Sequence, residues 1–293
     1  MSKLKIVRGY PEYMREHIEA VEKTRDKRLK ETFPLMRLEE REEILKKFHP
    51  DYKEEAKRPV KVGHNKGDRM PHEVVDLLES HPLVEPEDID LSKVDFDVDV
   101  LIIGGGGAGM TAALWANYSG IDAENIIIVQ KLRLGDSNSI MSQGGIQAAD
   151  KSNDSPALHY LDVIGGGHFA NDRELARRLV LDAPQMIKWH EELGVIYDKE
   201  TDGTMITIHG GGTCRKRMHS ARDYTGLEIV RNLKDEIINK NIQVLEFTST
   251  VDLLTDENKQ VAGAVLYNME TQEYYVAKAK STVLTTGGFG RLH

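Results

Sequence analysis

Glycines make up the clearest chemical motif of this chain. Gly104, Gly106 and Gly109 have the spacing G-x-G-x-x-G. In this spacing the first glycine permits a tight turn, the second lets a pyrophosphate approach the backbone, and the third lets a helix pack closely on a strand. The helix that follows would direct its N-terminus at the phosphates. The run therefore predicts a dinucleotide site, with these contact residues: Gly104, Gly106, Gly107, Ala108 and Gly109.

The residue type after the next apolar run narrows the class of dinucleotide. A simple NAD site hydrogen-bonds its ribose through a carboxylate at the end of the second strand. Here the run NIIIV, residues 125–129, is followed by Gln130 and Lys131. An NAD site of that kind is therefore disfavoured.

A second stretch of small polar residues extends from Lys131 to Ala149. Its glycine pair, Gly144 and Gly145, would let the backbone pass close to a flat ligand and present amide donors to it. The residues alone fit an ordinary Ser/Gly loop equally well, so both interpretations stay open at this point. The candidate binding residues are Lys131, Ser137, Asn138, Ser139, Ser142, Gln143, Gly144 and Gly145.

The elements around these motifs predict an α/β fold. An apolar strand at 98–103, a helix at 110–119 and a second strand at 125–129 form a βαβ unit of the length that nucleotide binding requires. We expect two further helices, at 171–193 and 225–240. The apolar face expected for the first of them comprises Leu175, Leu179, Met186 and Trp189.

A series of strands follows these helices. The runs 243–256, 260–269, 273–279 and 281–288 are spaced as an antiparallel excursion that returns to the main sheet. Val251, in the first of these runs, belongs to the predicted cofactor-binding set. The fold prediction for 96–293 is thus a Rossmann-like domain with a parallel sheet and an antiparallel β insertion.

Residues 1–95 differ in composition and predict a helical N-terminal extension. Lys, Arg and Glu dominate, and prolines separate expected helices at 11–32, 36–57 and 72–80. In the first run Ile18, Val21 and Leu29 give only a sparse apolar stripe. We expect these helices to dock on a partner subunit or on the α/β domain, and a loosely ordered tail is the alternative.

Composition excludes several functional classes. The 293 residues are 40% hydrophobic and 30% charged, with a formal net charge of −9, which disfavours nucleic acid and anionic membranes as main partners. One cysteine, Cys214, permits neither a disulfide framework nor a cluster held by four thiolates. No G-x-S-x-G motif supports hydrolysis. No apolar run reaches about 18 residues and no secretory signal begins the chain, so we expect a cytoplasmic protein without a membrane span.

Histidines and basic residues carry weaker predictions. His159, His168 and His190 lack metal-ligand spacing, so we expect them to be structural or exposed and predict no metal site. A basic cluster stands near His209 and His219. We expect a solvated basic loop, with binding of carboxylates or phosphate as the alternative. The cluster consists of Arg215, Lys216 and Arg217.

The stretch from Lys131 to Gly145 resembles, without a gap, the flavin loop of the succinate dehydrogenase/fumarate reductase flavoprotein family, which includes L-aspartate oxidase. Residues 157–195 look like the helical stretch that follows this loop in the family. The resemblance extends to a glycine-glycine, Asp, Thr-Gly signature and to a second glycine turn near FAD, and covers 96–293. The matching residues are Gly211, Gly212, Asp223, Thr225, Gly226, Thr286, Gly287 and Gly288.

The resemblance implies FAD as the cofactor and hydride transfer through flavin N5. Membrane-bound members of the family carry a histidine, covalently bonded to the flavin, where this chain has Asn138. An amide cannot act as that nucleophile, so we expect dissociable FAD, and a non-covalent flavin leans toward reducing an acceptor such as fumarate. Amide donors at Ser142–Gly145 are expected at the flavin N5–O4 edge.

The family's substrate-activating residues are not expected in this chain. By resemblance, the catalytic arginine and the carboxylate-binding residues belong to a cap domain that begins just beyond Thr286–Gly288, so no catalytic residue is assigned. The chain would be one product of a split flavoprotein, a relay module or a fragment. Expected partners are an iron–sulfur subunit together with a cap-domain chain, with a small dicarboxylate as candidate substrate. The competing prediction is a non-catalytic electron-transfer or scaffold subunit that holds FAD.

Overall fold

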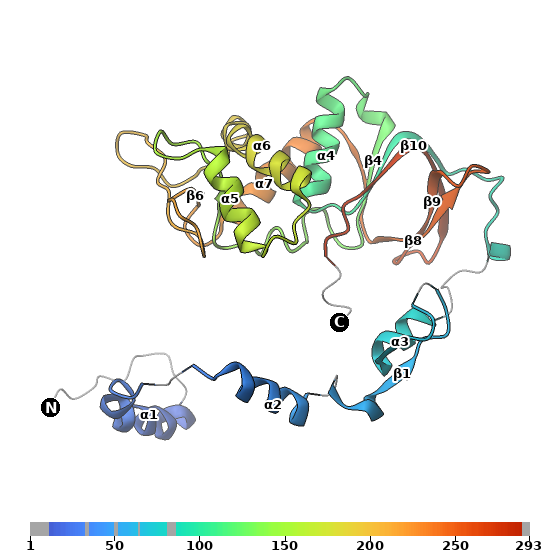
Figure 1. Cartoon of the computed structure of the whole chain (residues 1–293). Helices are drawn as coiled ribbons and strands as arrows, with labels where there is room; N and C mark the ends of the chain where they lie inside the picture. Colours follow the sequence, from blue (N-terminus) through green and yellow to red (C-terminus); the bar gives the residue numbers. More distant parts are fainter. Residues whose placement is uncertain (1–11, 33–34, 50–51, 64, 81–85, 289–293) are drawn as a thin grey trace. The chain divides into compact units, whose positions relative to one another are not determined.

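The computed structural model describes residues 12–32, 35–49, 52–63, 65–80 and 86–288 (Figure 1). The chain divides into two compact units, residues 1–81 and 82–293. This division lies earlier in the chain than the boundary predicted between residues 95 and 96. Strand β3 of the second unit begins at Phe96, where the α/β pattern was predicted to start.

The first unit combines short helices with a small hairpin. Its elements are η1 (Glu12–Met14), α1 (Arg15–Arg28), α2 (Leu38–Phe48), η3 (Glu54–Ala56), β1 (Lys57–Pro59), β2 (Arg69–Pro71) and α3 (His72–Leu78). The predicted helix over 36–57 is too long. Because the residue before a proline is pushed toward extended backbone, the chain leaves the helix at His49, which precedes Pro50 and has ψ of 127°.

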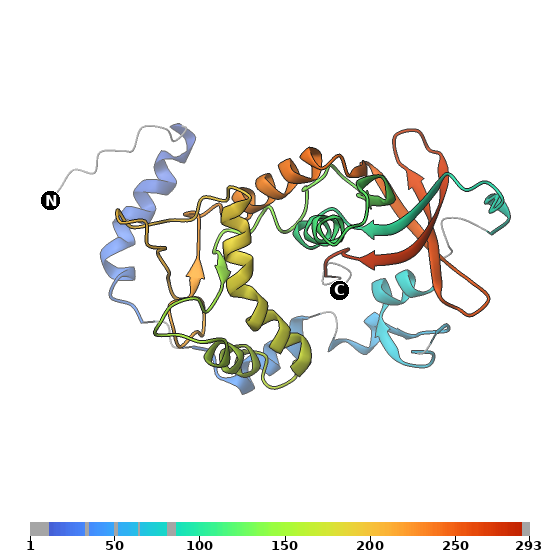
Figure 2. The ribbon, with the colours of Figure 1, turned by 90° about the horizontal axis from the view of Figure 1, so that it is seen from above.

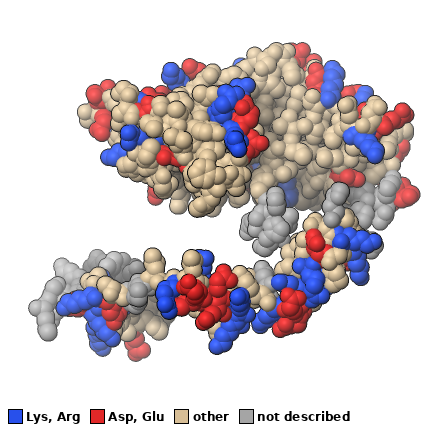
Figure 3. Space-filling view, in the orientation of Figure 1, with Lys and Arg blue, Asp and Glu red and all other residues tan. Residues whose placement is uncertain are grey.

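Helices α1 and α2 have no buried residue. Val21, on the predicted stripe of α1, is 49% exposed. Charged side chains of both signs crowd the surface of these helices in Figure 3. The exposed surfaces of these helices do not identify a partner, and the docking role predicted for residues 1–95 stays a prediction.

The second unit is built on a six-stranded sheet in the order β7-β4-β3-β10-β9-β8. Neighbours among β7, β4, β3 and β10 are parallel, whereas β9 and β8 form the antiparallel excursion. The strands are β3 (Phe96–Ile103), β4 (Ile126–Val129), β7 (Gln243–Leu245), β8 (Thr248–Thr255), β9 (Val261–Asn268) and β10 (Tyr274–Leu284). The predicted fold class is confirmed.

Strand β10 joins the two kinds of pairing. Its Val276 pairs with Val265 of antiparallel β9, and its Val283 pairs with Ile102 of parallel β3. The separate strands predicted at 273–279 and 281–288 are therefore one continuous strand. Its C-terminal end carries the second glycine turn to the edge of the sheet where the first one lies.

Helices and short elements complete this unit. They are η4 (Pro86–Asp88), α4 (Gly107–Tyr118), η5 (Ala123–Asn125), β5 (Ile146–Gln147), α5 (Pro156–Gly166), α6 (Arg173–Glu192), β6 (Met218–His219) and α7 (Thr225–Asn239). Side-chain caps fix two helix starts: Ser155 Oγ accepts from the N–H of Leu158 at 3.3 Å, and Asp172 accepts from the N–H of Leu175 at 2.9 Å.

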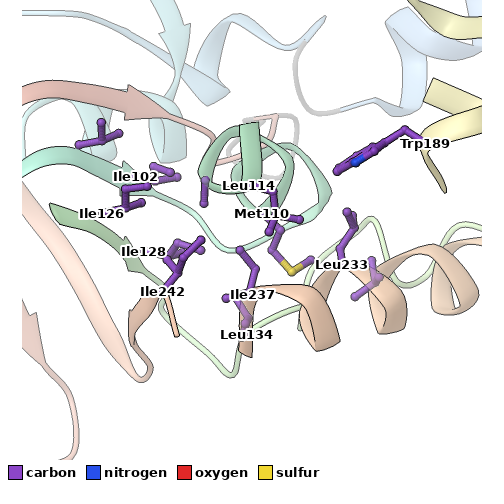
Figure 4. Close-up of a cluster of buried hydrophobic side chains, with 13 residues drawn as sticks. Ile102, Met110, Leu114, Ile126, Ile128, Leu134, Trp189, Leu233, Ile237 and Ile242 are labelled. Carbon is purple, nitrogen blue, oxygen red and sulfur yellow. The ribbon is translucent and has the colours of Figure 1, made fainter. Parts of the chain in front are cut away.

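The main core lies between the parallel strands and helices α4 and α7, as Figures 2 and 4 show. Alternate residues of a strand face opposite sides of a sheet, so one side of β3 and β4 supplies apolar residues to this core. The largest fully buried members are Ile102, Met110, Leu114, Ile126, Ile128, Leu233 and Ile237. The opposite face packs Leu101, Ile103, Ile127 and Val129 with residues of β9 and β10.

Helix α6 is present where predicted, but the prediction of its apolar face is partly wrong. Leu175 and Leu179 are 71% and 56% exposed, whereas Met186 and Trp189 pack in the main core. The buried residues are Ala176, Val180, Ala183, Ile187, Trp189 and His190. Helical periodicity fits both neighbouring stripes, and the leucines occupy the one that faces outward.

Candidate functional site

The first glycine turn connects β3 to α4. Gly104 has φ of +112°, and its N–H donates to the carbonyl of Val129 at 2.9 Å. A Cβ on Gly104 would overlap the backbone of Thr285, and one on Gly109 would overlap the carbonyl oxygen of Gly104. Both positions therefore require glycine, for the turn and for the close approach of α4 to β3.

Some backbone N–H groups at the start of α4 donate a hydrogen bond within the protein, whereas others are open donors without an acceptor. Gly105 N–H donates to Gln130 Oε1 at 2.6 Å, and Gly107 N–H donates to Ser139 Oγ at 3.2 Å. Within the described residues, the N–H groups of Gly106 and Ala108 have no acceptor. Open donors at a helix N-terminus, in the positive end of the helix dipole, suit a phosphate.

The flavin loop, residues 131–145, lies against this turn. A Cβ on Gly106 would stand 3.3 Å from Ser137 Cβ and 3.7 Å from Ser139 Oγ. The absence of a side chain on Gly106 therefore leaves space between the turn and the loop. The structure thus brings together four residues predicted separately from two motifs: Gly106, Gly107, Ser137 and Ser139.

Helix α7 holds the other end of the flavin loop. Gly226 N–H donates to the carbonyl of Ser142 at 2.7 Å, and Thr225 Oγ1 donates to the carbonyl of Gln143 at 3.2 Å. A Cβ on Gly226 would overlap the carbonyl oxygen of Ser139. The Thr-Gly pair of the resemblance therefore anchors the loop backbone.

Beyond this anchor the loop turns into the short strand β5. Gly145 has φ of +127°, and a Cβ there would overlap the carbonyl oxygen of His219, because β5 pairs with β6. Ser142, Gln143 and Gly144 are exposed. In the described part of the chain, the N–H groups of Gln143 and Gly144 donate to no acceptor, so they can face a ligand.

The second glycine turn lies beside the first because β10 runs parallel to β3. Leu284 pairs with Ile103, and the N–H of Thr285 then donates to the carbonyl of Ile103 at 2.8 Å. Thr286, Gly287 and Gly288 follow as exposed residues. Both glycine turns predicted from the sequence thus meet at one edge of the sheet.

Three other predicted residues are less closely tied to this arrangement. Lys131 and Asn138 are exposed, and the Asn138 carbonyl accepts from Met141 N–H at 3.2 Å. Val251 lies at a bulge of β8, which β9 and β10 separate from β3. Their contact with a cofactor stays a prediction.

Two residues that shape the site were not predicted to do so. Gln130 is 8% exposed and joins the first turn to the flavin loop, since Nε2 donates to the carbonyl of Asp136 at 2.9 Å. The Thr285 hydroxyl lies within hydrogen-bond distance of the carbonyls of Ile103 and Gly104. A polar residue directly after the apolar residues of a predicted strand was the sequence feature that could have indicated both.

The prediction of a solvated basic loop is wrong for Arg217. Arg217 is fully buried, with Nε and Nη2 at 2.7 and 2.9 Å from the carboxylate of Asp154, and Nη1 bonded to Asp162. These bonds lower the pKa of Asp154 and raise the pKa of Arg217. Arg215 and Lys216 are exposed, as predicted. Arg217 therefore ties the segment before β6 to α5 and to the turn that precedes α5, and it is not free to bind a ligand.

The isolated histidines are structural or exposed, as predicted. His159 and His190 are buried, and His168 is exposed. His190 Nδ1 lies 2.8 Å from the Tyr197 hydroxyl, and burial lowers the pKa of His190 to about 4. Across the described ranges, no three His, Cys, Asp or Glu side chains are grouped to hold a metal. In the same ranges no helix is long and apolar enough to cross a membrane.

Comparisons with known proteins agree with this geometry. One subunit of the fumarate reductase (CoM/CoB) of Methanothermobacter marburgensis is 33% identical over 201 residues, which cover 68% of this chain and 36% of that protein. L-aspartate oxidase of Streptomyces coelicolor is 32% identical over 198 residues, which cover 66% and 34%. These matches confirm the resemblance inferred from the flavin loop.

Among solved structures, the Mycobacterium smegmatis Sdh1 complex in the apo form superposes with a TM-score of 0.63 at 31% identity, covering 67% of this chain and 35% of that one. The chain thus spans about a third of the length of the curated relatives it matches. The FAD binding domain family matches residues 99–293, which include both glycine turns and the flavin loop. The chain therefore belongs to the FAD binding domain family.

Proposed function

We propose that this chain binds FAD non-covalently, as the FAD-binding part of an oxidoreductase of the fumarate reductase/succinate dehydrogenase type. The observation that carries the proposal is the meeting of two glycine turns and the flavin loop around open amide donors. The N–H groups of Gly106 and Ala108 would bind the pyrophosphate. Thr286–Gly288 would contact the cofactor from the neighbouring turn.

The flavin loop is suited to a flat ring system. Exposed Gln143 and Gly144 present N–H groups without acceptors among the described residues. The anchoring bonds from Thr225 and Gly226 fix the loop backbone, so these donors are held in place before a ligand arrives. When bound, FAD would supply an acceptor or donor of hydride at N5.

Asn138 supports a dissociable cofactor. Its side chain is an amide, which is not nucleophilic enough to form the covalent link to flavin that a histidine forms in membrane-bound members of the family. The position lies within the loop beside Gly106 and Gly107, between Ser137 and Ser139. We therefore expect FAD to be bound non-covalently and to be released by acid.

The reaction and the partners are proposed from the relatives. Fumarate reductase and L-aspartate oxidase stand among them, which supports hydride transfer to or from a small carboxylic acid. A cap-domain segment with substrate-binding residues and an iron–sulfur partner would complete the site. We also propose that residues 1–95 form a docking element and that the protein is located in the cytoplasm. The competing function, a non-catalytic FAD subunit, predicts a complex that lacks such a cap segment.

The FAD site can be tested at Gly106. Purified chain should be yellow, and Gly106→Val should lose FAD because the added methyl groups would fill the space beside Ser137. Gly166→Val is the matched control, since a Cβ there meets nothing within 4 Å. Full retention of FAD by the Gly106 variant would refute the site. Assays of the co-purified complex with fumarate, succinate and aspartate then distinguish a catalytic subunit from a non-catalytic one.

A further inference from the structure

Gln130 occupies the position at which nucleotide-binding folds commonly place an acidic ribose ligand, directly after the second strand. Its backbone is held on both sides: its N–H donates to the carbonyl of Leu245 at 2.8 Å, and its carbonyl accepts from Thr248 N–H at 2.9 Å. The side chain is almost completely buried, so it does not project toward solvent. Its direction is therefore set by the protein.

The side-chain amide of Gln130 joins two segments of the FAD site. Oε1 accepts from Gly105 N–H at 2.6 Å, and Nε2 donates to the carbonyl of Asp136 at 2.9 Å. A flipped amide would place a donor against a donor and an oxygen against an oxygen. The two partners therefore fix a single orientation of this amide.

Packing adds to these bonds. A Cβ on Gly105 would stand 3.2 Å from Gln130 Cβ and 3.0 Å from Leu134 Cδ1. The aliphatic part of Gln130 thus lies directly against the Gly105 backbone. The first glycine turn and the flavin loop are therefore in contact through this side chain. Ser137 and Ser139, which lie close to Gly106, come just after Asp136 in the loop.

We propose that Gln130 is a positioning residue of the FAD site, whose neutral amide sets the separation between the first glycine turn and the flavin loop and which a carboxylate cannot replace. The inference rests on the FAD-binding function proposed above. The position requires one acceptor and one donor. An ionised carboxylate has only acceptors, so one of its oxygens would face the carbonyl oxygen of Asp136.

An ionised carboxylate at this position would also repel the negatively charged cofactor directly. It would be a buried negative charge next to the turn whose amides receive a pyrophosphate, and neither partner of the native amide, the Gly105 N–H or the Asp136 carbonyl, is a cation. A protonated carboxylic acid, in contrast, has both a carbonyl oxygen and an O–H donor, and can reproduce the two bonds of the amide. The substitution Gln130→Glu should therefore be rescued by low pH.

The test measures the Kd for FAD in the full chain at pH 8 and pH 5.5, for the wild type, Gln130→Met and Gln130→Glu. Gln130→Met conserves volume and loses both bonds, so its Kd should rise on the order of tenfold at both pH values. Gln130→Glu should bind on the order of a hundredfold more weakly at pH 8 and return to within about threefold of the wild type at pH 5.5. Gln260→Glu, at an exposed position, is the charge control and should match the wild type.

Two native carboxyl groups lie near Gln130 in every variant, so each ratio of Kd values is taken against the wild type at the same pH. Asp136 pairs with Arg133 at 2.9 Å, and Glu246 accepts from Leu134 N–H at 2.8 Å. A Gln130→Glu ratio that does not change between the two pH values overturns the proposal, as does wild-type affinity in Gln130→Met. If Gln130→Met fails to fold, the proposal is tested by the Kd of Gln130→Glu relative to the wild type, compared between pH 8 and pH 5.5. Failure of the wild type to bind FAD refutes instead the proposed function.

Discussion

The Thr285 hydroxyl lies 2.8 Å from the carbonyl oxygen of Gly104, so the residue that begins the second glycine turn is bonded to the residue that begins the first. The backbones of these residues are also in direct contact, because a Cβ on Gly104 would overlap the carbonyl of Thr285. The parallel pairing of β10 with β3 produces this contact between residues 181 positions apart. The two glycine turns of the proposed FAD site are therefore one packed unit.

Thr285→Val removes this hydroxyl at nearly constant volume. The variant loses the bonds to the carbonyls of Gly104 and Ile103, so the free energy of unfolding should fall by about 1 to 2 kcal/mol. Urea unfolding with and without FAD measures the change, and FAD should stabilise the variant less than the wild type. Thr271→Val, on an exposed turn, should have little effect. Equal behaviour of the two variants would contradict the role given to Thr285.

Gly109→Ala tests the approach of α4 to β3. The added Cβ would overlap the carbonyl oxygen of Gly104, so α4 must move away and the open amides at its start move with it. The variant should lose FAD and at least about 2 kcal/mol of stability. Gly165→Ala, within α5, where an added Cβ would meet nothing within 4 Å, should be neutral or stabilising by up to about 1 kcal/mol. Thermal unfolding and flavin absorbance distinguish the two outcomes.

Arg217→Met leaves the carboxylates of Asp154 and Asp162 in or near the interior without their cation. The expected loss of stability is roughly 3 to 5 kcal/mol, against less than about 0.5 kcal/mol for the exposed control Lys216→Met. In the wild type, Arg217 lowers the pKa of Asp154 below its unfolded value. This stabilisation is present above the unfolded pKa and is lost as the pH falls below it, so the acid transition should be shallower in Arg217→Met.

His190 predicts a second pH effect. Burial lowers its pKa to about 4 from 6.5, so the unfolded chain binds a proton that the folded chain does not between these values. Stability should fall as the pH decreases from about 6.5 to 4, by up to about 3 kcal/mol at about 1.4 kcal/mol per pKa unit. His190→Gln should flatten this part of the profile, whereas the exposed His168→Gln should keep it. Chemical denaturation across this pH range provides the measurement.

The βαβ unit of the FAD site could be predicted from the sequence because its determinants are local. Buried strands such as Ile126–Val129 are continuous apolar runs, and the glycine spacing between β3 and α4 specifies both the turn and the helix start. The hairpin of β1 and β2 escaped prediction because strands of three residues have too little pattern to recognise.

Some contacts that hold the fold and the site together are not local, and the sequence pattern did not indicate them. Arg217 stands in a basic cluster and looks solvated, yet its carboxylate partners lie 63 and 55 positions earlier in the chain. Thr285 likewise acts through the pairing of strands that are far apart in the sequence, whereas the partners of the Gln130 side chain lie 25 and 6 positions away. On α6, Leu175 and Val180 belong to two stripes of equal period, and only the neighbouring elements determine which one is buried.

The most direct test of the central claim is the flavin content of the purified chain after acid precipitation. The account predicts a yellow chain that releases intact FAD into the supernatant, near one FAD per chain, and leaves a colourless pellet. Apo chain prepared in this way and refolded should bind added FAD again. Flavin that remains with the precipitate would contradict non-covalent binding, and a colourless chain that binds no added FAD would contradict the FAD site itself.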